Sequence, residues 1–463
     1  MYIAPVPPDY HLVVASDGTV SGSGPGLVPE WVGQSQVGDA EIAHALLLRL
    51  PQAAADLVDG AAAVHIADRH CRRDGRTIEK WSRHIAIEIP VRDPERWNHP
   101  ILHTALHDLL AYQTEDEWSL TFVQRVAQPR VAEMSEPLFS EDVPPTVVAL
   151  FSGGLDSLAG ASRELIERRD DRVVLLSIDA NDRLGKVQRD LVAGLRRKTT
   201  REIIHVSTPL GYHRRGRPYN DDERTQRSRG FAFLALGAVV AHVAGVNRLS
   251  VYENGIGAIN LPYSAAQFGA QQTRAVAPET LVRAGVVIRL ALDTPFAFGL
   301  PFLFETKATL CGSLTVLGVA HLVSTAVSCD GFPLRKAVCQ CGTCTSCLLR
   351  RQSIHAAGLA VFDGGYLRDV LDPPDDMTPA RWHPLQLMRG QVRVIHHAVN
   401  QADPWRALCR AFPQLIATEA AAGDLGFPRV QVAGQLVALY RCYCDEWASF
   451  PAVPLVRAAQ VAA

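Results

Sequence analysis

Residues 146–157 read TVVALFSGGLDS. The first six are apolar enough for both faces of a central strand in a parallel sheet, where helices cover each side. Similar strands are predicted at 172–178, 202–206 and 248–252, with a long helix at 230–245. Strands that alternate with helices in this way predict an α/β domain, a parallel sheet with helices on both faces.

The loop after the first strand carries residues suited to phosphate. Gly153 and Gly154 let the backbone approach a ligand without a Cβ clash, and the following helix directs unpaired N–H groups at the loop. Ser152 and Ser157 can donate from their hydroxyls, whereas Asp156 repels phosphate and suits Mg²⁺ instead. The alternative is a glycine-rich turn with Ser or Asp as the helix N-cap. Six such residues directly after an apolar strand favour phosphate binding.

Four cysteines have the spacing of a metal site. Two residues lie between Cys341 and Cys344, and two between Cys344 and Cys347. Eleven residues separate Cys329 from Cys341. Four thiolates in tetrahedral geometry suit Zn²⁺ and leave no open position for catalysis. An iron–sulfur cluster is the alternative at this spacing. Cys339 can replace Cys329 as the fourth ligand or remain a free thiol.

The composition excludes several classes of protein. The chain has 463 residues, 48% apolar and 20% charged, which excludes a chain that is disordered overall. Lys plus Arg (46) nearly balances Asp plus Glu (48), so nucleic acid or an anionic membrane would need a local patch. We expect no transmembrane helix and no signal peptide, and therefore a cytoplasmic protein. Ten cysteines are too sparse for a secreted disulfide scaffold.

Three blocks and a linker are predicted along the chain. Residues 1–127 predict a small α+β domain, and a proline-rich segment at 128–146 predicts an extended linker. The α/β domain spans 146–365, and 380–463 have helical spacing. Within the first block we expect strands at 61–67, 84–89 and 118–126 and a helix at 100–112.

Several charged and polar residues are further candidates for the site. Arg227 and Arg229 directly precede the long helix and can clamp a pyrophosphate with paired donors. Their segment, 212–230, also holds acidic residues, so a solvated loop is the alternative and a nucleic-acid patch is not favoured. Glu253 and Asn254 follow a strand end, where they can contact a nucleobase or cap a helix.

The loop is similar to the SGGxDS signature of the PP-loop ATP pyrophosphatases, which have an adenine-nucleotide α-hydrolase-like fold. The resemblance implies cleavage of ATP between its α and β phosphates, with adenylation of a substrate oxygen. It also assigns ATP binding to the loop residues, which are Ser152, Gly153, Gly154, Leu155, Asp156 and Ser157.

The cysteine motif, followed by Arg350 and Arg351, resembles the zinc motif of the 7-cyano-7-deazaguanine synthases (QueC). The segment FETKATL at 304–310 is similar to that family's T-K-A-E segment, which implies an active-site role for Lys307. The resemblance covers 146–358, with a zinc-binding subdomain at 329–347. It implies ATP, Mg²⁺ and Zn²⁺ as cofactors. It also implies a ligase that converts a carboxyl group to an amide and a nitrile on a 7-deazaguanine, as in queuosine synthesis.

Two departures from that family bear on the substrate and partners. Residues 252–262, YENGIGAINLP, replace a Tyr-Pro-Asp-type stretch of the substrate pocket, and the two outer blocks have no counterpart in the housekeeping enzyme. Extended chains of this kind resemble the QueC-like component of Qat anti-phage systems (QatC-like). This implies a protein partner encoded nearby, bound by the outer blocks, and a deazapurine or related small substrate. The alternatives are a tRNA-modifying PP-loop ligase and a nucleotide-binding assembly subunit without turnover.

Overall fold

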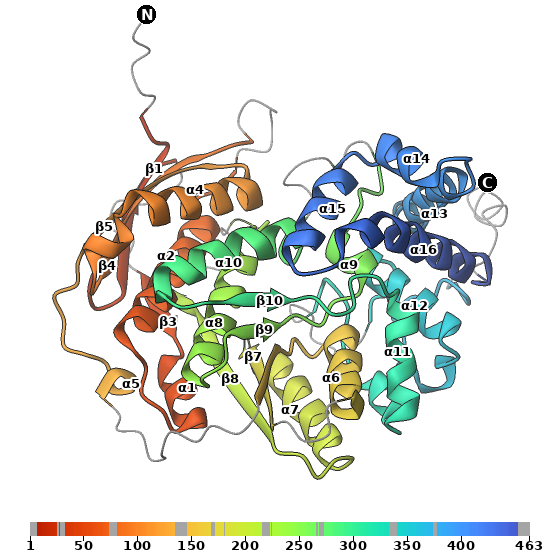
Figure 1. Ribbon diagram of the computed structural model, residues 1–463, viewed down its shortest axis with the longest axis horizontal. Helices are drawn as coiled ribbons and strands as arrows, with labels where there is room; N and C mark the ends of the chain where they lie inside the picture. The colour runs from red at the N-terminus through yellow and green to blue at the C-terminus, as the bar shows by residue number, and fades with distance from the viewer. Residues whose placement is uncertain are drawn as a thin grey trace, which may run out of the picture.

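All the strands of the described residues join one ten-stranded sheet (Figure 1). The computed structural model describes residues 7–25, 27, 33–73, 81–134, 146–167, 172–179, 181–214, 223, 225–264, 267, 273–332, 340–373 and 377–451. The strands in chain order are β1 (Tyr10–Val14), β2 (Thr19–Ser23), β3 (Gly33–Val37), β4 (His84–Val91), β5 (Glu117–Gln124), β6 (Thr146–Leu150), β7 (Arg172–Asp179), β8 (Ile203–Arg214), β9 (Arg248–Ser250) and β10 (Ala297–Gly299). Their order across the sheet is β10-β9-β6-β7-β8-β3-β2-β1-β4-β5.

Sixteen α-helices are described. In chain order they are α1 (Asp39–Leu46), α2 (Gln52–His70), α3 (Pro94–Trp97), α4 (Pro100–Thr114), α5 (Val131–Met134), α6 (Leu155–Glu167), α7 (Asp182–Arg196), α8 (Arg229–Val243), α9 (Gly255–Ile259), α10 (Pro278–Leu292), α11 (Lys307–Val316), α12 (Thr345–Ala356), α13 (Pro379–Val399), α14 (Pro404–Ala411), α15 (Gln414–Asp424) and α16 (Arg429–Ala448). No helix in the described part of the chain is long and apolar enough to cross a membrane.

The five strands β6 to β10 form the parallel half of the sheet, as predicted. Alternate residues of β7 point to opposite faces. Val174 and Leu176 pack with the core that includes α8 and α10, while Val173 and Leu175 pack with α6, α7 and α11. The α/β class with helices on both faces is therefore confirmed. The long helix predicted at 230–245 is confirmed as α8.

The strand order places a switch point between β6 and β9. The chain moves outward from β6 through β7 to β8, then returns to the other side of β6 to form β9 and β10. In open α/β sheets, ligands bind beyond the carboxyl ends of the two strands where the order reverses. The loop at 151–154 and the residues after β9 meet at that position.

One predicted strand is wrong. Residues 61–67 lie inside α2, a buried helix that packs against α8 and β4. Periodicity cannot separate a short buried strand from a buried helix, and the alanines of this run favour the helix. The other three elements expected in this block are confirmed as β4, α4 and β5. In the segment predicted as an extended linker, Val131–Met134 forms the short helix α5, and 135–145 lie outside the described residues.

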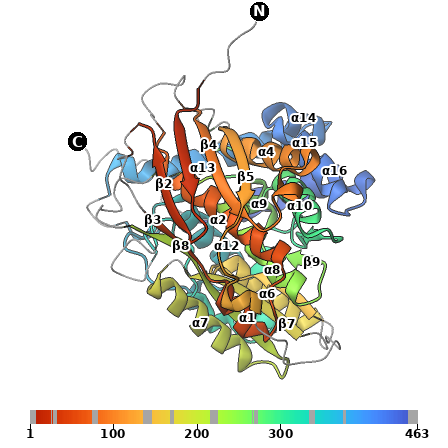
Figure 2. The same ribbon diagram turned by 90° about the vertical axis from the view of Figure 1, so that its left-hand side faces the viewer.

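The N-terminal strands continue the parallel half of the sheet. β3 pairs antiparallel with β8 over five residue pairs, from Gly33 opposite Arg214 to Val37 opposite Leu210. Figure 2 shows β1 to β5 from the side, as one surface that runs into β8. The block predicted at 1–127 thus shares its sheet with the block predicted at 146–365.

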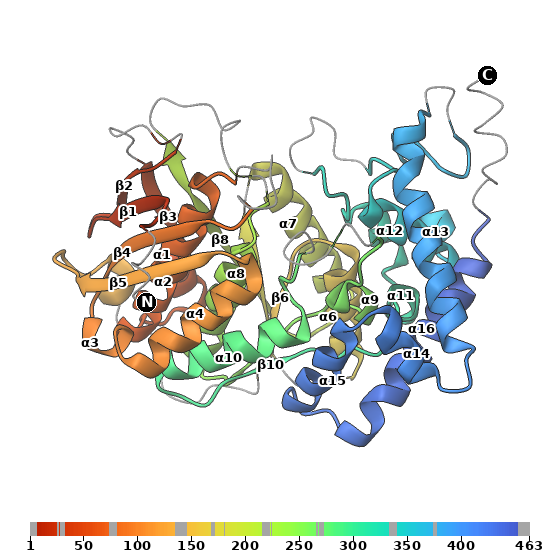
Figure 3. The same cartoon turned by 90° about the horizontal axis from the view of Figure 1, so that it is seen from above.

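The C-terminal helices α13 to α16 confirm the helical character of the last block. They lie at the opposite end of the molecule from β1 to β5, with α9, α11 and α12 between them and the sheet (Figure 3). α13 and α16 pack against α12, and α15 packs against α10. This arrangement brings the C-terminal helices close to the residues that follow β9.

Candidate active site and metal centre

The loop after β6 is held in shape by its own side chains. The Ser152 hydroxyl accepts from the Gly154 N–H (3.2 Å), and the Ser157 hydroxyl donates to the Gly154 carbonyl (3.0 Å). Gly153 has φ +80°, a left-handed conformation that favours glycine. From α7, the Gln188 amide donates to the Ser152 carbonyl (3.2 Å). Sequence reasoning missed Gln188, because only the fold brings α7 against this loop.

The predicted loop residues continue into the first turn of α6. Leu155 is completely buried and packs in the same apolar cluster as Phe151 and Leu158. Asp156 and Ser157 are also buried. Together with Ser152 to Gly154, these residues form a helix N-terminus at the switch point, which is a place where proteins bind anionic groups.

Lys307 lies against Asp156. Its ammonium group forms a buried ion pair with the Asp156 carboxylate, although 151 residues separate the two in sequence. Burial alone would lower the pKa of Lys307, but Asp156 and Glu253 outweigh it and raise that pKa. The structure thus joins two residues that we predicted from separate motifs.

Two residues beyond β9 complete this cluster. The Asn254 amide donates to Asp156 Oδ1 (2.9 Å) and to Glu253 Oε1 (3.0 Å), while its carbonyl oxygen caps α9 through the Gly257 N–H (3.1 Å). Burial, followed by the negative charge of Asp156, raises the pKa of Glu253 to about 8, and Lys307 offsets this only in part. A carboxylic acid that titrates near neutral pH can give or accept a proton under physiological conditions.

Arg227 and Arg229 lie at the start of α8 and face the N-terminal block. Burial, then the charge of Arg73, lowers the pKa of Arg227 to about 10. Arg229 stacks over the Phe233 ring, with its guanidinium carbon 5.7 Å from the ring centroid. Among the described residues, no hydrogen bond or ion pair joins either arginine to Ser152–Ser157. Most of the arginine-rich segment before them lies outside the described residues.

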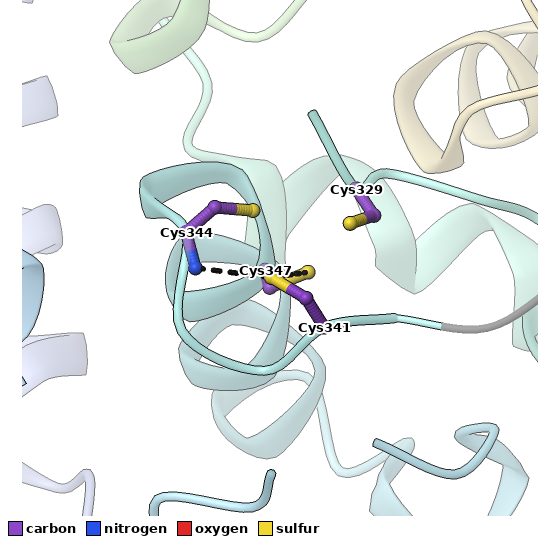
Figure 4. Close-up of side chains that lie close together, drawn as sticks. All are labelled: Cys329, Cys341, Cys344 and Cys347. Atoms are coloured by element: carbon purple, nitrogen blue, oxygen red, sulfur yellow. Dashed lines mark hydrogen bonds between the residues drawn. The ribbon is translucent and has the colours of Figure 1, made fainter. Parts of the chain in front are cut away.

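The four predicted cysteines come together (Figure 4). The Sγ atoms of Cys329, Cys341, Cys344 and Cys347 all lie within 4.8 Å of one another, and their side chains point toward a common centre. The structure thus forms a four-cysteine cluster that can hold a metal ion. Cys339 lies outside the described residues.

The backbone around the cluster has the shape of a metal-binding knuckle. The N–H groups of Thr343 and Cys344 donate to the Cys341 sulfur, at 3.4 and 3.2 Å. Gly342, with φ +82°, allows this turn. Cys347 comes from α12, which begins at Thr345.

Arg350, which follows the cysteine motif, stabilises the backbone next to this centre. Arg350 is fully buried and donates to the carbonyls of Val323 and Ala326, at 2.7 and 2.9 Å, and to Asp363. These bonds hold the segment that leads to Cys329. Arg350 therefore has a structural position in the described part of the chain.

Sequence comparison adds no family to this description, because neither protein-family models nor curated proteins match the chain. Fold and site define an α/β protein with a parallel-rich sheet, a glycine-rich loop at its switch point and a four-cysteine cluster.

Proposed function

We propose that the chain is an ATP-dependent enzyme of the PP-loop type that adenylates a carboxylate or amide oxygen. The observation that carries this proposal is the cluster of Asp156, Lys307, Asn254 and Glu253 directly beside the Ser152–Ser157 loop. The loop follows β6, whereas Glu253 and Asn254 follow β9, so a nucleotide would lie over the carboxyl ends of these two strands.

The proposed reaction assigns the loop to the leaving pyrophosphate. The substrate oxygen attacks the α-phosphorus, the bond from that phosphorus to the bridging oxygen breaks, and pyrophosphate leaves. The N–H groups at the start of α6 and the hydroxyls of Ser152 and Ser157 would hold its oxygens. Lys307 would neutralise part of the developing negative charge.

In the second half-reaction an amine attacks the activated carbon. AMP leaves with the former carboxylate oxygen, and one proton is released. Glu253, which titrates near neutral pH, is the group that would accept that proton. An adenylated amide needs no second amine: the carbon–oxygen bond to AMP breaks, the amide nitrogen loses its remaining proton to Glu253, and a nitrile forms.

Mg²⁺ fits the donor set of this cluster. Asp156 offers carboxylate oxygens, which Mg²⁺ prefers, and this carboxylate keeps further lone pairs when it accepts from Lys307 and Asn254. When bound, Mg²⁺ would offset the charge of the triphosphate.

We further propose that the four-cysteine cluster holds one structural Zn²⁺. Zn–S bonds of about 2.3 Å in a tetrahedron place the sulfurs about 3.8 Å apart. The Cys341 and Cys347 sulfurs are 3.8 Å apart. An iron–sulfur cluster would place several atoms between the sulfurs and hold them further apart, so this spacing favours a single ion.

The substrate and partner in this proposal follow the resemblance. The substrate class is a 7-deazaguanine acid or a related deazapurine, joined to ammonia or to an amine of a partner protein. The outer blocks would bind that partner as part of an anti-phage defence system.

The proposal is tested by the products formed from ATP. The full-length protein, given 7-carboxy-7-deazaguanine and an ammonium salt, is expected to release AMP and pyrophosphate in equal amounts. ADP with inorganic phosphate would contradict the proposed reaction. ATP binding without turnover, with and without a candidate partner, would indicate the assembly subunit instead.

A matched pair of lysine variants sharpens this test. Lys307→Met should slow AMP release by about 10²-fold or more, the usual loss when one transition-state donor is removed. Lys186→Met is the control, because Lys186 is 71% exposed on α7 and pairs only with Asp190 among the described residues. Equal rates for the two variants would remove Lys307 from the mechanism.

A further inference from the structure

Glu446, on the C-terminal helix α16, contacts the residue that caps the lysine helix. Thr306 is the N-cap of α11, and its hydroxyl oxygen accepts from the Thr309 N–H (3.1 Å). The same hydroxyl donates its proton to Glu446 Oε1. Lys307 is the next residue in the chain, so the cap and the lysine belong to one turn.

The carboxylate decides which way the Thr306 hydroxyl points. A hydroxyl has one proton and two lone pairs, and a good N-cap needs a lone pair directed at the first turn of its helix. Because Glu446 accepts the proton, the lone pair remains available to Thr309. Thr306 is 2% exposed, so within the described residues Glu446 takes the place that water would fill at a surface cap.

The second oxygen of Glu446 extends this link to the metal centre. The Gln352 amide donates to Glu446 Oε2 (3.3 Å) from α12, the helix that carries Cys347. One carboxylate therefore joins three helices: α16, the lysine helix α11 and the cysteine helix α12.

The C-terminal helices also contact the segment that carries Asn254. Gly255 lies so close to Leu439 of α16 that a Cβ on this glycine would be 2.7 Å from the leucine side chain. From α13, the Gln391 amide donates to the carbonyls of Leu261 and Pro262, at 2.8 and 3.0 Å. The last block thus supports both sides of the Asp156 cluster.

We propose that Glu446 is a positioning residue, which fixes the α11 cap so that the Lys307 ammonium group stays on Asp156. The C-terminal helices are then part of the catalytic unit, in addition to any partner surface that they carry. This inference rests on the proposed function for its kinetic readout, but Lys307 itself provides a second readout that does not.

The kinetic experiment compares Glu446→Ala, Glu446→Gln and the control Asp445→Ala in the full-length protein. Asp445 is the neighbouring, exposed carboxylate of the same helix. For Glu446→Ala we expect kcat to fall by about 10²-fold, the usual effect of misplacing a catalytic group by about 1 Å, while KM for ATP changes by less than about threefold. Glu446→Gln keeps an acceptor for Thr306 and should restore kcat to within about tenfold of the wild type.

The second experiment labels lysine amines with a water-soluble acylating reagent and measures Lys307 by peptide mass spectrometry. Lys307 is 7% exposed and should resist the reagent in the wild type. Its labelling rate should rise by about tenfold or more in Glu446→Ala and stay unchanged in Asp445→Ala. Only Glu446→Ala removes the acceptor that orients the Thr306 hydroxyl at the start of α11. This labelling experiment tests the role of Glu446 even if the wild type releases no AMP.

Metal content and thermal unfolding show whether each variant is folded. If Glu446→Ala is not, Thr306→Val and Thr306→Ser replace it. The valine variant should reproduce the loss of kcat and the faster labelling, and the serine variant should show neither. Wild-type kcat and labelling in a folded Glu446→Ala protein, or equal losses in Asp445→Ala, would overturn the proposal.

Discussion

Glu253, Asp156 and Lys307 place two carboxyl groups and one ammonium group in the same buried space. One carboxylate is neutralised by the lysine, and the other is left with burial and a like charge, so its pKa rises. Two neighbouring carboxyl groups whose pKa values differ in this way can take different roles in one reaction. Asp156 suits charge stabilisation, while Glu253 suits proton transfer.

The raised pKa of Glu253 predicts a pH dependence of stability. The folded protein releases this proton at a pH of about 8, and the ordinary value is 4.5. Between these values the folded state holds more protons than the unfolded chain, so the free energy of unfolding falls as the pH rises. Glu253→Gln should remove this slope and gain stability relative to the wild type, on the order of a few kcal/mol at pH 8.

Denaturant titrations of both proteins from about pH 5 to pH 8.5 measure this difference. Glu167→Gln is the control, because Glu167 is 59% exposed on α6. Parallel pH profiles for the wild type and Glu253→Gln would show that Glu253 titrates normally.

At the scale of the element, the glycine-rich loop after β6 depends on one residue in a left-handed conformation, Gly153. Gly153 has φ +80°, and a Cβ there would lie 3.0 Å from the Gln188 side chain. Gly312, in the middle of α11, is the opposite case, since a Cβ there would meet no atom within 4 Å. The two glycines therefore differ in backbone conformation and in the room that each leaves for a Cβ atom.

Gly153→Ala should lower the free energy of unfolding by about 1–2 kcal/mol, the cost of a left-handed alanine. Gly312→Ala should raise it by about 0.5–1 kcal/mol, because alanine loses less entropy in a helix. Urea unfolding of the ligand-free protein measures both. A loss of stability in both variants would mean that added volume, rather than backbone conformation, is responsible.

The knuckle and helix that carry Cys341, Cys344 and Cys347 form a second element, which we expect to depend on metal. The wild type should contain one zinc ion per chain by elemental analysis. Cys347→Ser should lose that ion and unfold at lower temperature, because binding at such sites contributes on the order of 10 kcal/mol to folding. Cys442→Ser, an exposed cysteine of α16 outside the cluster, should keep the ion. Stoichiometric iron in the wild type would overturn the zinc assignment.

At the scale of the whole molecule, the N-terminal block is joined to the parallel sheet by more than the β3–β8 ladder. The Asp68 carboxylate, fully buried at the end of α2, accepts from the Ser228 backbone and hydroxyl, at 2.8 and 2.9 Å. The Arg73 backbone donates to Glu223 (2.8 Å). Removing the block would expose the edge of β8 and leave Ser228 without these partners.

We therefore expect residues 146–463 to be insoluble when expressed alone, because an uncovered strand edge and a bare apolar face favour aggregation. Coexpression with residues 1–145 as a separate chain should restore a soluble complex. Solubility after centrifugation and co-purification through a tag on either piece measure this. A monomeric, folded 146–463 fragment would contradict the expectation.

The sequence alone was sufficient for the local features. The loop after β6 is predictable because a buried strand, two glycines and the start of a helix follow one another directly in the sequence. The cysteine motif is predictable because its spacing brings three thiols together within one knuckle. For these, the groups that act together are close in the chain, so residue type and spacing are enough. The strands β6 to β9 were predictable from their own apolar runs, whereas β10 was not predicted.

Only the tertiary structure decided the rest. It showed that the run at 61–67 is part of helix α2, packed on α8 and β4, because a short buried apolar run fits either a strand or a helix. It joined β3 to β8, and it brought Lys307 to Asp156 and Glu446 to Thr306, over 151 and 140 residues. Such contacts depend on how faces pack across the whole chain, which no local pattern of residues specifies.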